Sequence, residues 1–182
     1  MQTAKIASAA AILFLFSLTV SYGADVAKIG VVDFQRIFEI SSAGKSANAE
    51  FKSQGEKMAA DLKKKEGELE ELKKRLEREA LVMSGEMLEE KEREFRIKIN
   101  DFKSLEKKYK EELRALNSRL VNRIKKDLYE LIEEIGRKEG YLLIIEKQDA
   151  GVVYAPTSID ITDKLIPQYN EKVAQQAKKD KK

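Results

Sequence analysis

The stretch VAKIGVVDFQRIFE (residues 26–39) is the first part of this chain with the pattern of a folded protein. Its apolar and β-branched segment, Lys28 to Phe34, predicts a strand that runs directly into a helix. A lone strand is unstable in water, because its backbone N–H and C=O groups need a neighbouring strand. Charged, helix-forming sequence occupies about the next hundred residues. The strand is therefore expected to pair with a segment much later in the chain.

Strand-like sequence returns only after Gly140, with the continuous apolar run YLLIIE from Tyr141 to Glu146. Such a run is typical of a strand that is buried on both faces. The sequence QDAG (residues 148–151) predicts a turn, after which Val152 to Ala155 predicts another short strand and an amphipathic helix follows. We therefore expect a small α+β body made of residues 24–44 and 139–174, with strands near residues 27–34, 141–147 and 152–155.

A body of about 65 residues is too small to bury a large core, so we expect it to self-associate. The apolar faces of the predicted strands are the natural contact surface, because a strand that is apolar on both faces has to be covered on both. The candidate residues for the body and its assembly are Ile29, Val31, Val32, Leu142, Ile144, Val152 and Val153.

The segment between the two halves of the body, residues 45–138, has the pattern of a coiled coil. It contains no proline, and apolar residues recur in alternating steps of four and three up to a break at Ser84-Gly85, after which a second apolar seam begins. Two seams around a break predict an antiparallel helical hairpin that forms an arm, with its tip near residues 82–87. A single uninterrupted helix is the alternative, but it leaves a long apolar stripe exposed in each half. Polar residues interrupt both seams and are expected to make the arm flexible: Lys65, Glu79, Glu92 and Glu106.

The N-terminus has the layout of a secretory signal peptide. Lys5 supplies a basic region, Ala9 to Val20 is an apolar run, and Ser21-Tyr22-Gly23 provides small residues for cleavage before Ala24. A membrane anchor is the alternative, but about a dozen apolar residues fall short of the ~20 needed to span a bilayer. We therefore expect residues 1–23 to be removed and the mature chain to be soluble and exported. At the other end, residues 175–182 are expected to form a frayed basic tail.

Composition excludes several classes of chemistry. The chain has no cysteine and no histidine, which leaves no disulfide, no thiolate and no imidazole for metal binding or general-base catalysis. No pocket or partner can be argued for the pairs Glu133-Glu134 and Asp160/Asp163, so we expect no catalytic site, no cofactor and no metal, and a protein that is not an enzyme. Charged residues make up 37% of the chain and nearly balance, with 35 basic and 32 acidic, as in long solvated helices.

Two features of the arm are candidate contacts for a client protein or a lipid. Lys73, Lys74 and Arg75 form a basic cluster, although closely spaced glutamates make pairing within the helix the simpler interpretation. Met83 and Met87 flank the tip, where adaptable thioether side chains either contact clients or seal the end of the hairpin. Nucleic-acid binding is not expected, because it needs a basic face of one sign and a recognisable module.

The sequence resembles the Skp/OmpH family of periplasmic chaperones. The resemblance rests on KIGVVDFQRIF after a signal peptide, on the charged helical hairpin, and on the ending YLLIIEKQDAGVVYAPTSIDITDKLI. It implies a homotrimer whose strands form a central barrel-like body and whose arms hang like tentacles around a cavity. It also implies that unfolded outer-membrane proteins are held there without ATP, in the periplasm. Some members bind lipopolysaccharide through basic residues on the arms, but no motif here places that site on particular residues.

Three functions follow from these observations. The first is an ATP-independent holdase, which needs no catalytic group but many weak contacts around a client. The second is a structural or tethering coiled coil of the envelope, which has a partner-specific tip and no client cavity. The third is a protein that binds lipopolysaccharide or an anionic membrane surface, helped by a small net positive charge of the arm.

Overall fold

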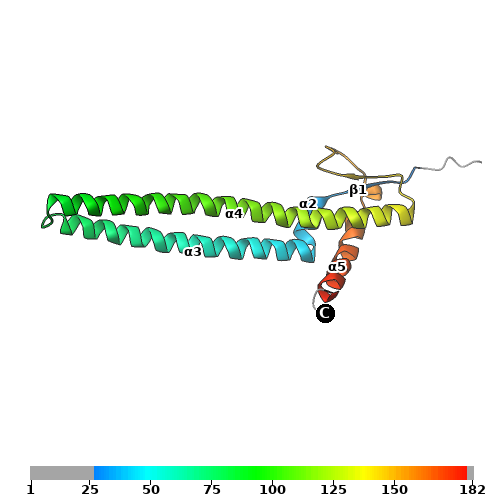
Figure 1. The fold of residues 1–182 in the computed structure, drawn as a ribbon. Helices are drawn as coiled ribbons and strands as arrows, with labels where there is room; N and C mark the ends of the chain where they lie inside the picture. The colour runs from blue at the N-terminus through cyan, green and yellow to red at the C-terminus, as the bar shows by residue number, and fades with distance from the viewer. Residues whose placement is uncertain (1–26, 180–182) are drawn as a thin grey trace, which may run out of the picture.

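The computed structural model describes residues 27–179, which form a small body and one long helical arm (Figure 1). The predicted signal peptide and residues 180–182 of the predicted tail lie outside the described residues. The elements in chain order are β1 (Ile29–Val32), α2 (Phe34–Ile40), α3 (Ser42–Glu79), α4 (Gly85–Glu139), β2 (Leu143–Glu146), the 3-10 turn η1 (Thr157–Ile159) and α5 (Thr162–Lys179). None of the described helices combines the length and the apolar character that a membrane span requires.

Helices α3 and α4 lie side by side and antiparallel, which confirms the predicted hairpin over the single helix (Figure 1). At about 1.5 Å per residue, the 38 residues of α3 extend about 57 Å from the body. The predicted break has a local cause: the Ser84 hydroxyl accepts a hydrogen bond from the Met87 backbone N–H at 3.4 Å and caps α4. Gly140 ends α4 with a φ of 71°, a conformation that glycine adopts without strain.

The apolar seams meet along the hairpin, but they are buried to different degrees. In the outer part of the arm the seam side chains are only half-buried, because two helices cover just one side of each other. Next to the body, which we call the root of the arm, the seam of α4 is fully buried because α2 and α5 also pack there. The buried seam residues at the root are Leu116, Leu120, Ile124, Leu128, Leu131 and Ile135.

The first predicted strand, β1, pairs with a strand late in the chain. Strand β1 is parallel to β2, in a register that places Ile29 opposite Leu143 and Val32 opposite Glu146. Parallel strands need a long crossover, and here the whole hairpin arm supplies it. The predicted pairing of two segments more than a hundred residues apart is confirmed.

The predicted third strand is wrong for the single chain. Residues 152–155 have no regular secondary structure and pair with no strand in the described part of the chain, where the sheet has only two strands. The other edge of β1 is instead bridged by the segment before α5, where the Ile161 N–H donates to the Val31 carbonyl at 2.9 Å. The Val152 N–H donates to the Lys147 carbonyl at 2.8 Å and closes the turn, but residues 153–155 form no backbone hydrogen bond within the described part of the chain, and a strand cannot form without a neighbouring strand.

Two further expectations need correction. The β2 segment is not buried on both faces, because Leu142 is 74% exposed and Leu143 is 50% exposed. Residues 175–179 are not a frayed tail, because α5 continues through them; alanine, glutamine and lysine are good helix formers and no glycine or proline interrupts them.

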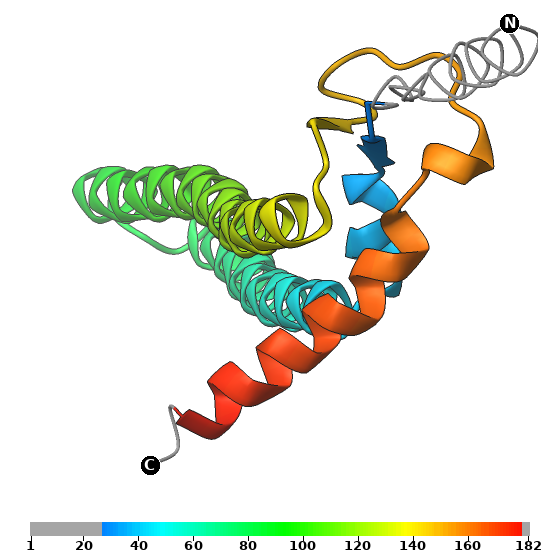
Figure 2. The ribbon, with the colours of Figure 1, turned by 90° about the vertical axis from the view of Figure 1, so that its right-hand side faces the viewer.

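Helix α5 closes the core by crossing the root of the arm (Figure 2). Its Leu165 and Tyr169 are completely buried together with Ile37 of α2 and Leu128 of α4. The corner between α2 and α3 is equally tight. A Cβ atom on Gly44 would lie 1.9 Å from the Phe38 carbonyl oxygen, so only glycine fits there.

Candidate functional site

The body exposes a set of large apolar side chains around the sheet, which we call the apolar edge. Strand partners Ile29 and Leu143 lie on the same face of the sheet, and both are exposed. Val153 and Tyr154, on the segment that follows the turn after β2, are 99% and 82% exposed. A body this small seldom exposes so many large apolar side chains unless they take part in an interaction surface. The apolar edge consists of Ile29, Leu142, Leu143, Val153 and Tyr154.

The opposite face of the sheet belongs to the core of the chain itself. A Cβ atom on Gly30 would lie 3.3 Å from Ile144 Cγ1, and one on Gly136 of α4 would lie 3.5 Å from Ile144 Cδ1. Ile144 therefore points toward α4, and Val32 is also buried within the chain. Of the predicted body and assembly residues, Ile29, Leu142 and Val153 lie on the apolar edge. Val32 and Ile144 face the core, whereas Val31 is buried on the same face of the sheet as Ile29, outside the core cluster, and Val152 is half-buried.

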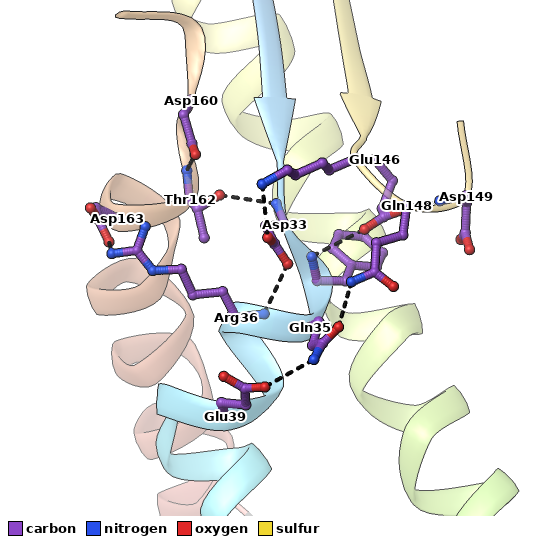
Figure 3. Close-up of polar contacts among 12 residues, drawn as sticks. Asp33, Gln35, Arg36, Glu39, Glu146, Gln148, Asp149, Asp160, Thr162 and Asp163 are labelled. Carbon is purple, nitrogen blue, oxygen red and sulfur yellow. Dashed lines mark hydrogen bonds and ion pairs between the residues drawn. The ribbon is translucent and has the colours of Figure 1, made fainter. Parts of the chain in front are cut away.

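A polar network at the end of β1 holds the body together (Figure 3). The Asp33 carboxylate accepts a hydrogen bond from the Arg36 N–H at 3.0 Å and caps α2. The Asp33 N–H donates to the buried hydroxyl of Thr162 at 2.9 Å, and the Thr162 N–H donates to Asp160 at 2.9 Å. Arg36 also pairs with Asp163 at 2.7 Å. This network joins α5 to β1 and thereby fixes the apolar edge relative to the root of the arm.

The arm carries shallow grooves. In its outer half, α3 and α4 border an open groove of about 840 Å³. Its floor contains Leu69, Leu72, Phe102 and Leu105, and charged side chains such as Lys65 and Arg75 form its rim. At the root, a second hollow of about 500 Å³ lies between α2, α3 and α4. Apolar floors with charged rims suit weak contacts with amphipathic chains rather than tight binding of one small molecule.

The predicted basic cluster is largely neutralised by neighbouring glutamates. Lys74 lies 2.9 Å from Glu70 and 3.8 Å from Glu71, and the hydrogen bond that it donates to the Glu70 carboxylate raises the pKa of Lys74. Lys73 lies 3.9 Å from Glu77. Both lysines remain exposed on the surface of α3, whereas Arg75 lies at the rim of the outer groove.

The arm tip exposes apolar side chains in addition to the two predicted methionines. Met87 is exposed and Met83 is half-buried, as a residue at the end of a hairpin seam would be. Leu81 and Val82, which the sequence analysis did not single out, are almost fully exposed. The signal for them was present, because two bulky apolar residues outside the heptad positions of a hairpin have nothing to pack against. Within residues 27–179, no group of three or more acidic side chains is placed to hold a metal ion.

These features define a class: a two-helix arm inserted into a small α+β body that leaves an apolar surface uncovered. The chain belongs to the OmpH-like outer membrane protein family, whose model matches residues 28–169. It is 29% identical over 155 residues to a Skp-like protein of Pseudomonas aeruginosa, covering 79% of this chain and 84% of that protein. Its fold is also that of a crystal structure from Caulobacter crescentus described as a putative OmpH-like outer membrane chaperone. The TM-score is 0.74 at 18% identity, over 82% of this chain and 88% of the other.

Proposed function

We propose that this protein is an ATP-independent holdase chaperone of the periplasm, which keeps unfolded outer-membrane proteins from aggregating. Family membership supports a role in outer-membrane protein biogenesis, and the predicted signal peptide supports export. The observation that carries the proposal is the arm itself. It is a long, charged hairpin with shallow apolar-floored grooves, anchored on a body that exposes apolar side chains.

The apolar edge supports assembly into a homotrimer. Five large apolar side chains would otherwise face water, and covering them is favourable by about 25 cal/mol per Å² of apolar surface. Residues 153–155 form no backbone hydrogen bond with any described residue, so they are available to add to the sheet of a neighbouring subunit. Three subunits joined in this way project three arms from one body and enclose a cavity between them.

The physical demands on a holdase match this arrangement. A client must be held away from other clients but released for assembly, which favours many weak contacts over one deep pocket. The arms carry exposed charges over most of their surface, which keeps a loaded complex soluble. No step of this activity requires a cofactor or a reacting group.

The test is an aggregation assay. A urea-unfolded outer-membrane β-barrel protein is diluted into buffer, and light scattering is followed with and without the mature protein. We expect stoichiometric trimer to suppress scattering, and a variant with shortened arms but an intact body to lose this activity. Unchanged aggregation at a several-fold excess of trimer would contradict the proposal.

A second candidate function is that of an envelope tether, which the exposed Leu81 and Val82 at the tip favour. A tether needs the tip sequence for a specific partner. Replacing Leu81 and Val82 by serine should therefore leave a holdase active in the aggregation assay, whereas it should abolish the binding of a tether to its partner.

A further inference from the structure

The turn that follows β2 is a closed loop whose two ends are tied together. The Lys147 N–H donates to the Val32 carbonyl at 2.8 Å, and the Val152 N–H donates to the Lys147 carbonyl at 2.8 Å. Inside the turn, the Ala150 N–H donates to the Glu146 carbonyl at 3.2 Å. Because the turn is closed in this way, the direction in which the chain leaves it at Val152 depends on how the whole turn is held.

Two side-chain contacts hold this turn against the root of the arm, and we call them together the clip. The Lys125 ammonium on α4 lies 3.1 Å from the Asp149 carboxylate of the turn. The Gln148 side-chain amide donates to the side-chain oxygen of Gln35 on α2 (Figure 3). Gln35 in turn donates to Glu39 at 3.1 Å, which fixes the orientation of its amide. The clip therefore fixes the turn relative to both helices.

Lys125 compensates the negative charge of two residues of this region. The Glu146 carboxylate accepts hydrogen bonds from the Asp149 N–H and, at 3.2 Å, from the Phe34 N–H, so the two acidic residues lie close together. The hydrogen bond to Asp149 raises the pKa of Lys125, and the charge of Glu146 adds to the increase. Without the ammonium the two carboxylates would have no shared counter-charge, and their repulsion would weaken the contact of the turn with α4.

We propose that the clip aims residues 153–155 at the sheet of a neighbouring subunit, so that Lys125 and Gln35 are positioning residues for assembly although neither belongs to the apolar edge. This inference rests on the assembly proposed above and adds the residues of the arm that control it. Residues 153–155 form no backbone hydrogen bond with any described residue, so their direction is set by the turn that precedes them. Joining a neighbour costs a segment conformational entropy, and the cost is smaller when its direction is already fixed.

The effect of the clip on one subunit is small, but a trimer contains three clips. The side chains of Lys125 and Asp149 are 33% and 58% exposed, and an ion pair of this kind changes an equilibrium by about threefold. Three independent losses multiply to about 30-fold in the dissociation constant of the trimer. The concentration at which half of the trimer dissociates varies as the square root of that constant, so it rises about fivefold.

The test dilutes the mature protein and follows its mass, which gives the concentration at which half of the trimer has dissociated. Lys125→Gln removes the ion pair of the clip, and Lys125→Arg keeps the positive charge. The matched control is Lys172→Gln, which removes an ion pair between α5 and α4 that does not involve the turn. In that pair Lys172 lies 3.5 Å from Glu130, and the side chains are 26% and 51% exposed.

We expect Lys125→Gln to raise this concentration about fivefold, and Lys125→Arg and Lys172→Gln to change it less than about twofold. At a concentration where every variant is trimeric, hydrogen exchange at residues 153–155 should be faster in Lys125→Gln than in the wild type and unchanged in Lys172→Gln. An unchanged dissociation of Lys125→Gln, or equal shifts in Lys125→Gln and Lys172→Gln, would overturn the inference.

The failure of this inference can be told apart from the failure of the proposals on which it rests. A wild-type protein that is monomeric at every concentration would contradict the proposed assembly and the inference with it. A trimer whose dissociation does not depend on Lys125 would contradict the inference alone. The aggregation assay with wild-type protein is independent of both outcomes and tests the holdase function by itself.

Discussion

Leu143 provides the sharpest test of how the body assembles. It is 50% exposed in the single chain, on the same face of the sheet as Ile29. Complete burial of a leucine is worth about 1.5–3 kcal/mol, so covering its exposed half on assembly contributes about 1 kcal/mol per subunit. Leu143→Asp removes this contribution and places a carboxylate without a partner in an apolar contact, which costs several kcal/mol more. Over three subunits the loss is on the order of 10 kcal/mol, enough to dissociate a trimer at micromolar concentration.

The assay combines light scattering for mass with circular dichroism for helix content. We expect Leu143→Asp to give a monomer that keeps its helices, because the side chain is not part of the core. Leu81→Asp at the exposed arm tip is the matched control and should remain trimeric. Ile144→Asp should disturb the body itself, since Ile144 packs toward Gly30 and Gly136. A Leu143→Asp protein with the full trimer mass would refute the assignment of the apolar edge as the interface.

Three further predictions concern stability. Tyr169 is completely buried, and its hydroxyl has no hydrogen-bond partner in the described part of the chain. Tyr169→Phe should therefore raise the free energy of unfolding by about 1 kcal/mol in urea titrations. A decrease of similar size would mean that the hydroxyl is hydrogen-bonded. Met58 is buried between the two helices of the arm, so Met58→Ala should speed hydrogen exchange in the arm without changing the mass of the trimer. Unaltered exchange would contradict the assignment of Met58 to the apolar seam. Hydrogen bonds from Lys164 and Lys28 lower the pKa of the Glu139 carboxyl. The stability that these ion pairs contribute should therefore be complete above pH 4.5 and be lost as the pH falls through the lowered pKa. Thermal melts at decreasing pH should show a smaller loss of stability for Glu139→Gln than for the wild type.

The long elements of the fold were predictable because their signals are local and periodic. The heptad seams and the Ser84-Gly85 break are properties of neighbouring residues, and a helix responds mainly to those. The pairing of β1 with β2 followed from elimination, since few other apolar runs of strand length were present. The prediction of a third strand failed because the formation of a strand is not decided by neighbouring residues alone. A strand at residues 152–155 depends on a neighbouring strand that the described part of its own chain does not supply.

The candidate site was less predictable than the fold. The hydrogen bond between the Asp33 N–H and the Thr162 hydroxyl joins residues 129 positions apart, so no local sequence pattern predicts it. Ile144 and Leu143 look alike in the apolar run, yet only the register with β1 shows which of them faces the core.

The central claim is that three copies of this chain share one body and hold an unfolded client between their arms. The most direct measurement is the mass of the complex formed when the mature protein meets a urea-unfolded outer-membrane β-barrel protein, determined by light scattering after size separation. The account predicts a trimer when the protein is alone and a soluble particle of one trimer plus one client after mixing. A monomeric protein, or a trimer that elutes unchanged while the client precipitates, would contradict it.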